Sequence, residues 1–367
     1  MKLAIVAQGP EHREAVAAFN QRLIDALGQP PFLLPLDPRP AASHVGKIRA
    51  RHYVALEESQ VRGGYLAVVY PCVLNGADVL AANLQAPLSE SIVDKRFQPV
   101  IRQMIAHLLD EHPLAFCVGM SSLNHPFPRR LRSLGWSAEE VPFFFRVHRA
   151  AAFLKQMPIL QSPWPKRLAV RLAAFSGVGA AGRLWLHRRR RAIPRNLSLV
   201  REQSWGAWAD SVWAAYRSEL RFGVRREAAV LPELYPPQEP RLRIFRILAA
   251  AETVGWAAAL LTDMRENQYF GNLRVGTVLD AAARPEACFA VAALADEALG
   301  AEGADLVITN QSLPRWQQAF FAAGFRRGPS NYLFAGSPAL VEALSPTPVA
   351  DGLVQLVRGD GDGRLHL

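Results

Sequence analysis

A succession of strand and helix patterns occurs twice along the chain, and this repetition constrains the fold more than any other feature. Each half shows a strand, a helical region, three strands, a long helix, a strand, a short helix and closing strands. The order predicts two α/β domains, each with a mostly antiparallel central sheet flanked by helices. The expected strands are 2–8, 52–56, 64–73, 78–84, 114–120 and a closing pair around 141–147, then 198–202, 242–250, 253–262, 272–279, 304–310 and 330–334.

The helical patterns follow the same repetition. RRLRSLGW (Arg129–Trp136) and QAFFAAGF (Gln318–Phe325) take equivalent places, and in each a helix runs into a Gly suited to a left-handed C-cap, followed by an aromatic residue. Asn75-Gly76 predicts a two-residue hairpin turn. The expected helices are 11–27, 95–111, 127–134, 206–218, 226–233, 284–300 and 314–322.

Length and composition agree with two domains. The chain has 367 residues and is 50% hydrophobic, so each half can bury a core. The three Cys and nine His show no metal-ligand spacing, which predicts no metal, no disulfide framework and a cytoplasmic location. We also expect neither a signal peptide nor a spanning helix. The expected divisions are an N-terminal domain 1–150, a linker 151–196, a C-terminal domain 197–340 and a tail 341–367.

The positive charge is concentrated in the linker. The chain has 42 Lys and Arg against 32 Asp and Glu, a formal charge of +10. Residues 151–200 hold 10 of these bases and no acid, so the rest has 32 bases (42 − 10) against 32 acids. Three interpretations remain open: a solvated joint, an anionic membrane anchor over 164–195 on the inner face of the membrane, or a nucleic-acid contact. The linker has no nucleic-acid recognition motif, which disfavours the last.

The element order resembles that of the GNAT superfamily of N-acetyltransferases, and QAFFAAGF resembles the close of that fold. The first half is also similar to GNAT-like proteins found with bacterial polysaccharide biosynthesis genes, through NLQAPLSESIVDKRF (Asn83–Phe97) and VPFFFRVHRAAAFL (Val141–Leu154). In the second half the similar stretch is FGVRREAAVLPELYP (Phe222–Pro236). The resemblance implies two tandem GNAT-like domains.

The resemblance also implies where an acyl donor binds. In that family acyl-CoA enters between the separated fourth and fifth strands, and a Gly-rich turn offers N–H groups to its pyrophosphate. The corresponding turn here begins at Glu90 and has no Gly-x-Gly. The residues that the resemblance assigns to acetyl-CoA or a longer acyl-CoA, bound as substrate, are Ser91, Ile92, Val93, Lys95, Arg96, Ser121, Ser122 and Asn310.

The catalytic candidates are fewer, because the Tyr that many members use as a general acid is replaced by Leu131 and Phe320. Glu90 is a candidate base for an amine, and a solvated loop carboxylate is the alternative interpretation. Asn124 and His125 follow a buried strand, where such folds bind ligands, and turn formation before a proline is their alternative.

Two functions from different classes follow. The first is N-acyl transfer from acyl-CoA or acyl-carrier protein to an amine acceptor, for example an amino sugar or a lipid-linked precursor. The second is a catalytically silent tandem scaffold that binds a partner, an acyl-carrier protein or a membrane surface. N-acyl transfer is the leading hypothesis, and the missing glycines and tyrosines strengthen the second.

Overall fold

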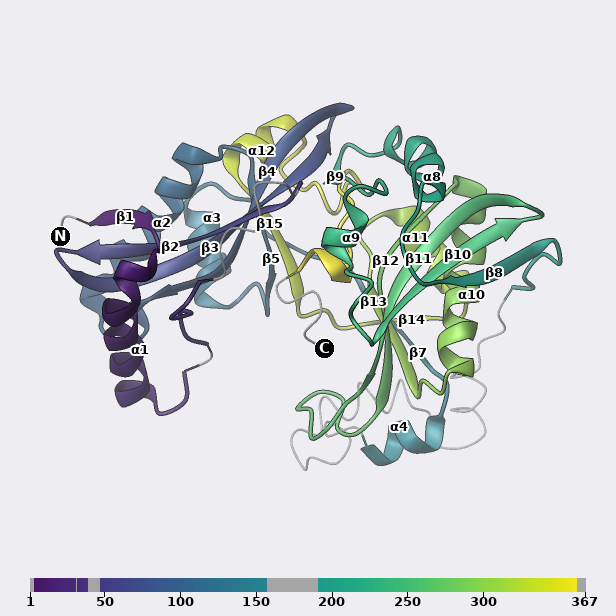
Figure 1. Ribbon diagram of the computed structural model, residues 1–367, viewed down its shortest axis with the longest axis horizontal. Coiled ribbons are helices and arrows are strands. Elements are labelled where there is room, and N and C mark those ends of the chain that lie inside the picture. Colours follow the sequence, from purple (N-terminus) through teal and green to yellow (C-terminus); the bar gives the residue numbers. More distant parts are fainter. Residues whose placement is uncertain (1–2, 31, 39–46, 157–190, 362–367) are drawn as a thin grey trace. The chain divides into compact units, whose positions relative to one another are not determined.

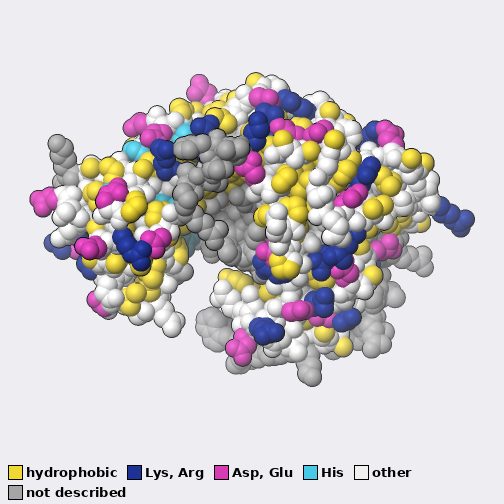
Figure 2. All heavy atoms as spheres, viewed as in Figure 1, with side chains coloured by type: hydrophobic (Ala, Val, Ile, Leu, Met, Phe, Trp, Pro, Cys, Tyr) yellow, Lys and Arg dark blue, Asp and Glu magenta, His cyan; other side chains and the backbone are white. Residues whose placement is uncertain are grey.

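The computed structural model describes residues 3–30, 32–38, 47–156 and 191–361, and it has two compact units. One unit gathers Met1–Glu139, Arg221–Arg225 and Leu333–Asp351, and the other gathers Glu140–Leu220, Arg226–Tyr332 and Gly352–Leu367. Most of the linker, including the basic segment 164–190, lies outside the described residues. On the face shown in Figure 2, positive and negative side chains are interspersed, in keeping with formal neutrality outside the linker.

The first unit is built on a mixed sheet in the order β1-β2-β3-β4-β5-β15-β6, with β9 paired to β3 (Figure 1). Its strands are β1 (Ala4–Ala7), β2 (Arg49–Glu57), β3 (Gln60–Leu74), β4 (Ala77–Ser89), β5 (Ala115–Met120), β6 (Glu139–Glu140), β9 (Phe222–Val224) and β15 (Tyr332–Gly336). Its helices are α1 (Arg13–Leu27), α2 (Gln98–Glu111), α3 (Pro126–Ser133) and α12 (Pro338–Ala343).

Two apolar clusters hold α1 and α2 on opposite faces of this sheet. On α1, Val16 and Phe19 pack in one cluster with Leu88 of β4. On α2, Met104 packs in the other cluster with Leu84 of β4. Side chains an even number of positions apart share a face of a strand, but the bulge described below lies between Leu84 and Leu88 and reverses that parity.

The second unit is built on a mixed sheet in the order β14-β7-β13-β12-β11-β10-β8. Its strands are β7 (Phe143–Val147), β8 (Leu197–Glu202), β10 (Leu242–Ala249), β11 (Glu252–Asp263), β12 (Arg274–Ala283), β13 (Leu306–Asn310) and β14 (Arg326–Gly328). Its helices are α4 (Ala150–Gln156), α8 (Trp208–Arg217), α9 (Leu231–Leu234), α10 (Cys288–Ala301), α11 (Pro314–Ala322) and the 3-10 turn η5 (Arg358–Asp360).

Each sheet contains a strand from the other half of the sequence. β7 pairs with β13 from Phe143↔Asn310 to Val147↔Leu306, and it also pairs with β14. Reciprocally, β15 lies between β5 and β6 of the first sheet. The expectation that 141–147 closes the first domain and 330–334 the second is therefore wrong, because an apolar strand pattern reports burial and not the pairing partner. Contiguous domains 1–150 and 197–340 do not describe these units.

The exchanged strand β7 is held by a buried carboxylate on α10. Asp296 is fully buried and accepts from Arg146 Nη1 at 2.6 Å. Its second oxygen lies 2.8 Å from His148 Nε2. Arg146 also donates to the carbonyl of Ala323, so one guanidinium joins β7 to α10 and to the end of α11. These contacts fix β7 in the second unit.

Several local predictions are confirmed and two are corrected. Asn75 and Gly76 have φ of 51° and 85° at the β3–β4 turn, and Gly135 and Gly324 have φ of 83° and 93° after their helices. The expected helix 226–233 is shortened to α9, and the fully buried Arg226 lies before it. The expected tail is folded as far as residue 361, where η5 packs against β12.

Candidate functional site

In each unit a parallel strand pair of the sheet separates toward one end. In the first unit the pairing of β4 with β5 stops at Asn83↔Phe116, although β4 continues to Ser89 and β5 to Met120. In the second unit the pairing of β12 with β13 stops at Thr277↔Ile308. Separated strands leave backbone groups that an extended ligand can pair with.

A bulge lies beside each separation. On β4, Gln85 opposes Leu66 and Leu88 opposes Gly64, so one extra residue is accommodated around Ala86, whose φ is 44°. On β12, Val278 opposes Ala259 and Asp280 opposes Ala258, which leaves Leu279 as the extra residue. A bulge redirects the following backbone and often marks a functional site in a sheet.

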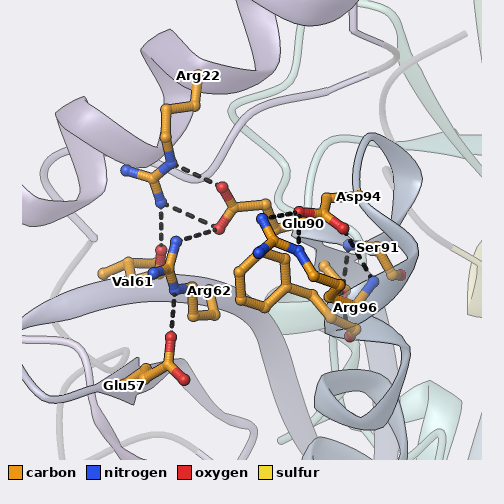
Figure 3. Close-up of polar contacts among 10 residues, drawn as sticks. Arg22, Glu57, Val61, Arg62, Glu90, Ser91, Asp94 and Arg96 are labelled. Atoms are coloured by element: carbon orange, nitrogen blue, oxygen red, sulfur yellow. Dashed lines mark hydrogen bonds and ion pairs between the residues drawn. The ribbon is translucent and has the colours of Figure 1, made fainter.

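The turn after β4 is anchored by Glu90, which is 5% exposed (Figure 3). Arg22 Nε and Arg62 Nη1 donate to its two oxygens at 2.7 and 3.0 Å. Arg22 also donates to the carbonyl of Val61, and Arg62 donates to Glu57, so the turn is tied to α1 and β3. Burial raises the pKa of Glu90, but hydrogen bonds from the two guanidiniums outweigh it and hold that pKa below its usual value. This geometry favours an anchoring carboxylate over a free base.

The backbone of the same turn uses its N–H groups internally. Ser91 N–H donates to Ser89 Oγ at 3.2 Å, and Arg96 N–H donates to Asp94 Oδ1 at 2.9 Å. Val93 N–H and Asp94 N–H both donate to the carbonyl of Glu90. These N–H groups are therefore not free to bind a phosphate.

The side chains of the turn point toward solvent to different degrees. Arg96 is paired with Asp94 at 2.6 Å, while Lys95 and Ile92 are exposed and no described residue pairs with Lys95. Of the expected phosphate contacts, Lys95 is available as it stands, and Arg96 would first have to break its ion pair with Asp94.

The loop after β5 places Ser121, Ser122, Asn124 and His125 together on the surface. Ser121 has φ of 65°, so the chain turns sharply as it leaves the strand. His125 Nδ1 accepts from the N–H of Phe127 at 3.5 Å and caps α3. Among the described residues, no hydrogen bond or ion pair connects this loop with the Glu90 turn.

The side chain of Asn310 on β13 is buried and forms hydrogen bonds within the protein. It is fully buried, its amide donates to the carbonyl of Val141 at 3.2 Å, and its oxygen accepts from Arg358 Nη1 at 3.0 Å. Leu131 and Phe320, which stand where the family often has its acid, are also fully buried. None of the three is free to meet a ligand in this structure.

Sequence reasoning missed a buried charge network at the bulge of β12. Arg226 is fully buried and donates to Asp280 Oδ2 at 2.7 Å and to Asp360 Oδ1 at 2.8 Å. Tyr235 O–H also donates to Asp280 at 2.8 Å. Burial raises the pKa of Asp280 to about 6, with Arg226 opposing and Asp360 adding to the shift. Arg226 and Tyr235 both lie in the stretch singled out for its family resemblance, but no spacing rule predicts a buried Arg.

The C-terminal segment completes this network and covers the end of β13. Ser312 Oγ donates to the carbonyl of Val354 and accepts from Leu356 N–H, and Gln311 forms a bridge with Val357. From Val275 to Ala283 every residue of β12 is buried, as is every residue of β13. In the first unit, by contrast, Ala86 and the loop after β5 are exposed. The separation in the first unit, called here the open separation, is therefore the one flanked by exposed residues.

Two kinds of site are absent from the described residues. No group of three or more His, Cys, Asp or Glu side chains among them could hold a metal ion. Within the same part of the chain, no helix combines the length and apolarity needed to cross a bilayer.

Comparison with known proteins adds evidence at the level of structure. No protein-family model matches the sequence, and no curated protein matches it. Similar solved structures include a conserved protein of Enterococcus faecalis described as a probable N-acyltransferase, with TM-score 0.53 and 13% identity over 94% of this chain and 75% of that chain.

Two further structures agree. Saccharomyces cerevisiae N-myristoyltransferase with bound myristoyl-CoA has TM-score 0.53 and 10% identity over 92% of this chain and 79% of that chain. A GCN5-related N-acetyltransferase from Anabaena variabilis has TM-score 0.51 and 10% identity over 91% and 72%. Identities this low show the fold alone. The chain therefore has the fold of the GNAT acyltransferases, with two mixed sheets flanked by helices.

Proposed function

We propose that this protein is an N-acyltransferase that takes an acyl group from acyl-CoA and transfers it to an amine, with the donor bound in the first unit. The observation that carries the proposal is the open separation of β4 and β5 beyond Asn83↔Phe116, beside the exposed bulge residue Ala86. The equivalent region of the second unit is buried and is crossed by Asp360 and the C-terminal segment.

The residues present suggest catalysis by positioning rather than by a strong acid or base. Glu90 is held by two arginines, and Leu131 has no proton to donate. A neutral amine placed against the thioester carbonyl needs mainly orientation and a donor to the developing oxyanion. His125, exposed in the loop between β5 and α3, is the side chain that we propose accepts a proton from the amine, through Nε2 because Nδ1 caps α3.

The acceptor class is proposed from chemistry. Two of the similar structures are described as a probable N-acyltransferase and an N-myristoyltransferase, which supports an amine acceptor. The resemblance to polysaccharide-associated GNAT-like proteins suggests an amino sugar or a lipid-linked amine. Acyl-carrier protein is the alternative donor. We propose a cytoplasmic location with peripheral membrane contact through the linker.

Calorimetry with coenzyme A, acetyl-CoA, octanoyl-CoA, myristoyl-CoA and an acylated carrier protein tests the donor. We expect one acyl-CoA to bind with one-to-one stoichiometry, and free-thiol release on addition of glucosamine or a lipid amine then tests transfer. If no thioester binds, the enzyme proposal is rejected.

One observation favours the scaffold as a second candidate. In the turn that would hold the pyrophosphate, four N–H groups already donate hydrogen bonds within the turn. A protein that binds the acylated carrier protein, binds no acyl-CoA and releases no thiol with any amine would support the scaffold instead.

A further inference from the structure

Gln85 occupies a particular place on β4. Two residues earlier, Asn83 makes the last pairing of β4 with β5, and the next residue, Ala86, begins the bulge. Gln85 therefore lies at the point where the two strands begin to separate. A side chain at this point meets whatever enters the separation.

The side chain of Gln85 lies on the sheet face opposite α2. Ala82 and Leu84 pack in the cluster that contains Met104 of α2. Successive side chains of a strand alternate between faces, so Gln85 points with Asn83 to the other side. Asn83 is fully buried there, and Gln85 is the next polar side chain along the strand toward the opening.

The carboxamide of Gln85 has unused hydrogen-bonding capacity. The residue is 9% exposed, yet no described residue donates to its oxygen or accepts from its nitrogen. Neither amide atom is fully enclosed, so the small surface that Gln85 keeps includes its polar end. A largely buried amide without a protein partner is destabilising unless a ligand or water satisfies it.

We propose that the Gln85 amide N–H donates a hydrogen bond to the thioester carbonyl oxygen of the bound acyl donor. The inference rests on the proposed function and adds a substrate-binding residue to it. A thioester carbonyl is only an acceptor, and Gln offers two N–H donors that an apolar side chain of equal size lacks. The direct neighbour of Gln85 is the bulge, where the backbone cannot supply a regular ladder of donors.

The contact strengthens during the reaction. The amine nitrogen attacks the carbonyl carbon, a C–N bond forms, and negative charge collects on the carbonyl oxygen that Gln85 faces. The C–S bond then breaks, the sulfur leaves as the thiolate of coenzyme A, and the proton lost by the amine converts this thiolate into the free thiol. The products are one amide and one free thiol, and no further reactant is needed.

A pair of ligands isolates the carbonyl contact. Octanoyl-CoA has the thioester carbonyl, and S-octyl-CoA is a thioether of the same length without it. Calorimetry should show that Gln85→Leu weakens octanoyl-CoA binding by about three- to tenfold and leaves S-octyl-CoA binding unchanged. Gln60→Leu is the control, because it makes the same substitution at the exposed first residue of the neighbouring strand β3. This variant should bind both ligands as the parent protein does.

The outcomes separate this inference from the proposed function. Equal weakening of both ligands by Gln85→Leu, or no weakening of either, overturns the role of Gln85 and leaves the proposed function standing. Failure of the parent protein to bind either ligand overturns both. Thermal unfolding checks the fold, and Gln85→Glu, which keeps the size but replaces the donors by an anion, should weaken octanoyl-CoA binding further if the contact is a donated hydrogen bond.

Discussion

Arg226 Nε donates to Asp280 Oδ2 across 2.7 Å, and neither side chain has any surface exposed to solvent. Asp360 accepts from the same guanidinium at 2.8 Å, so one buried cation faces two carboxyl groups. A buried excess of negative charge is unfavourable, because water no longer screens it. Burial is the main reason that the pKa of Asp280 is raised to about 6; Arg226 opposes the shift and Asp360 adds to it.

The raised pKa predicts that stability falls as the pH rises toward neutrality. The folded state holds a proton on Asp280 up to about pH 6, whereas an unfolded Asp loses it near 3.8. The stabilising contribution is complete below about pH 4 and is lost as the pH rises through 6, on the order of 2–3 kcal/mol. Urea unfolding of the parent and of Asp280→Asn between pH 4.5 and 7.5 should show a flatter profile for the variant; parallel profiles would contradict the assignment.

Glu90 should respond to pH in the opposite direction. Its pKa is lowered in the folded protein, so its contribution is present above the unfolded value of 4.5 and is lost as the pH falls through the folded pKa. Glu90→Gln removes the charge that Arg22 and Arg62 share and should reduce the free energy of unfolding by about 2 kcal/mol at pH 7. The deficit should shrink below pH 4. Glu58→Gln, at an exposed position of the neighbouring hairpin, is the control and should have little effect.

Much of the fold could be predicted from the sequence because local rules governed it. The Asn75-Gly76 turn needs two left-handed residues, and Gly135 and Gly324 end their helices for the same reason. The order of elements also follows from periodicity. Strand exchange could not be predicted, since Phe143–Val147 reads as a buried strand whichever sheet it joins.

The charge network could not be predicted for a different reason. Arg226 is charged and would be expected at the surface, and its two partners lie 54 and 134 residues further along the chain. Only the fold brings Asp280 and Asp360 together. The same limit applies to Glu90. An anchoring carboxylate and a catalytic base differ in their burial and not in their residue type.

The exchanged strands predict that contiguous domains will not fold alone. A fragment spanning 197–340 lacks β7, which lies between β13 and β14, and it lacks Asp360, the partner of Arg226. It should show no cooperative urea transition, because Asp296 loses Arg146 and Arg226 loses a carboxylate. A fragment spanning 140–361 restores both groups and should be measurably more structured by circular dichroism. A cooperative transition of 197–340 equal to that of the longer fragment would refute this account.

Blocking the separation of β4 and β5 should abolish donor binding without unfolding the protein. Ala86 is exposed at the bulge with φ of 44°, so Ala86→Phe introduces a bulky ring beside the opening without changing the backbone requirement. Binding of the acyl-CoA identified by calorimetry should weaken at least tenfold, while thermal unfolding should shift little.

Ala250 supplies a matched control for that substitution. It is also exposed, has φ of 53°, and lies in the β10–β11 turn of the second unit. Ala250→Phe makes the same change at a similar backbone conformation and should bind the donor as the parent does. If Ala250→Phe weakened binding and Ala86→Phe did not, the donor would not bind in the first unit, since only Ala86 lies beside the open separation.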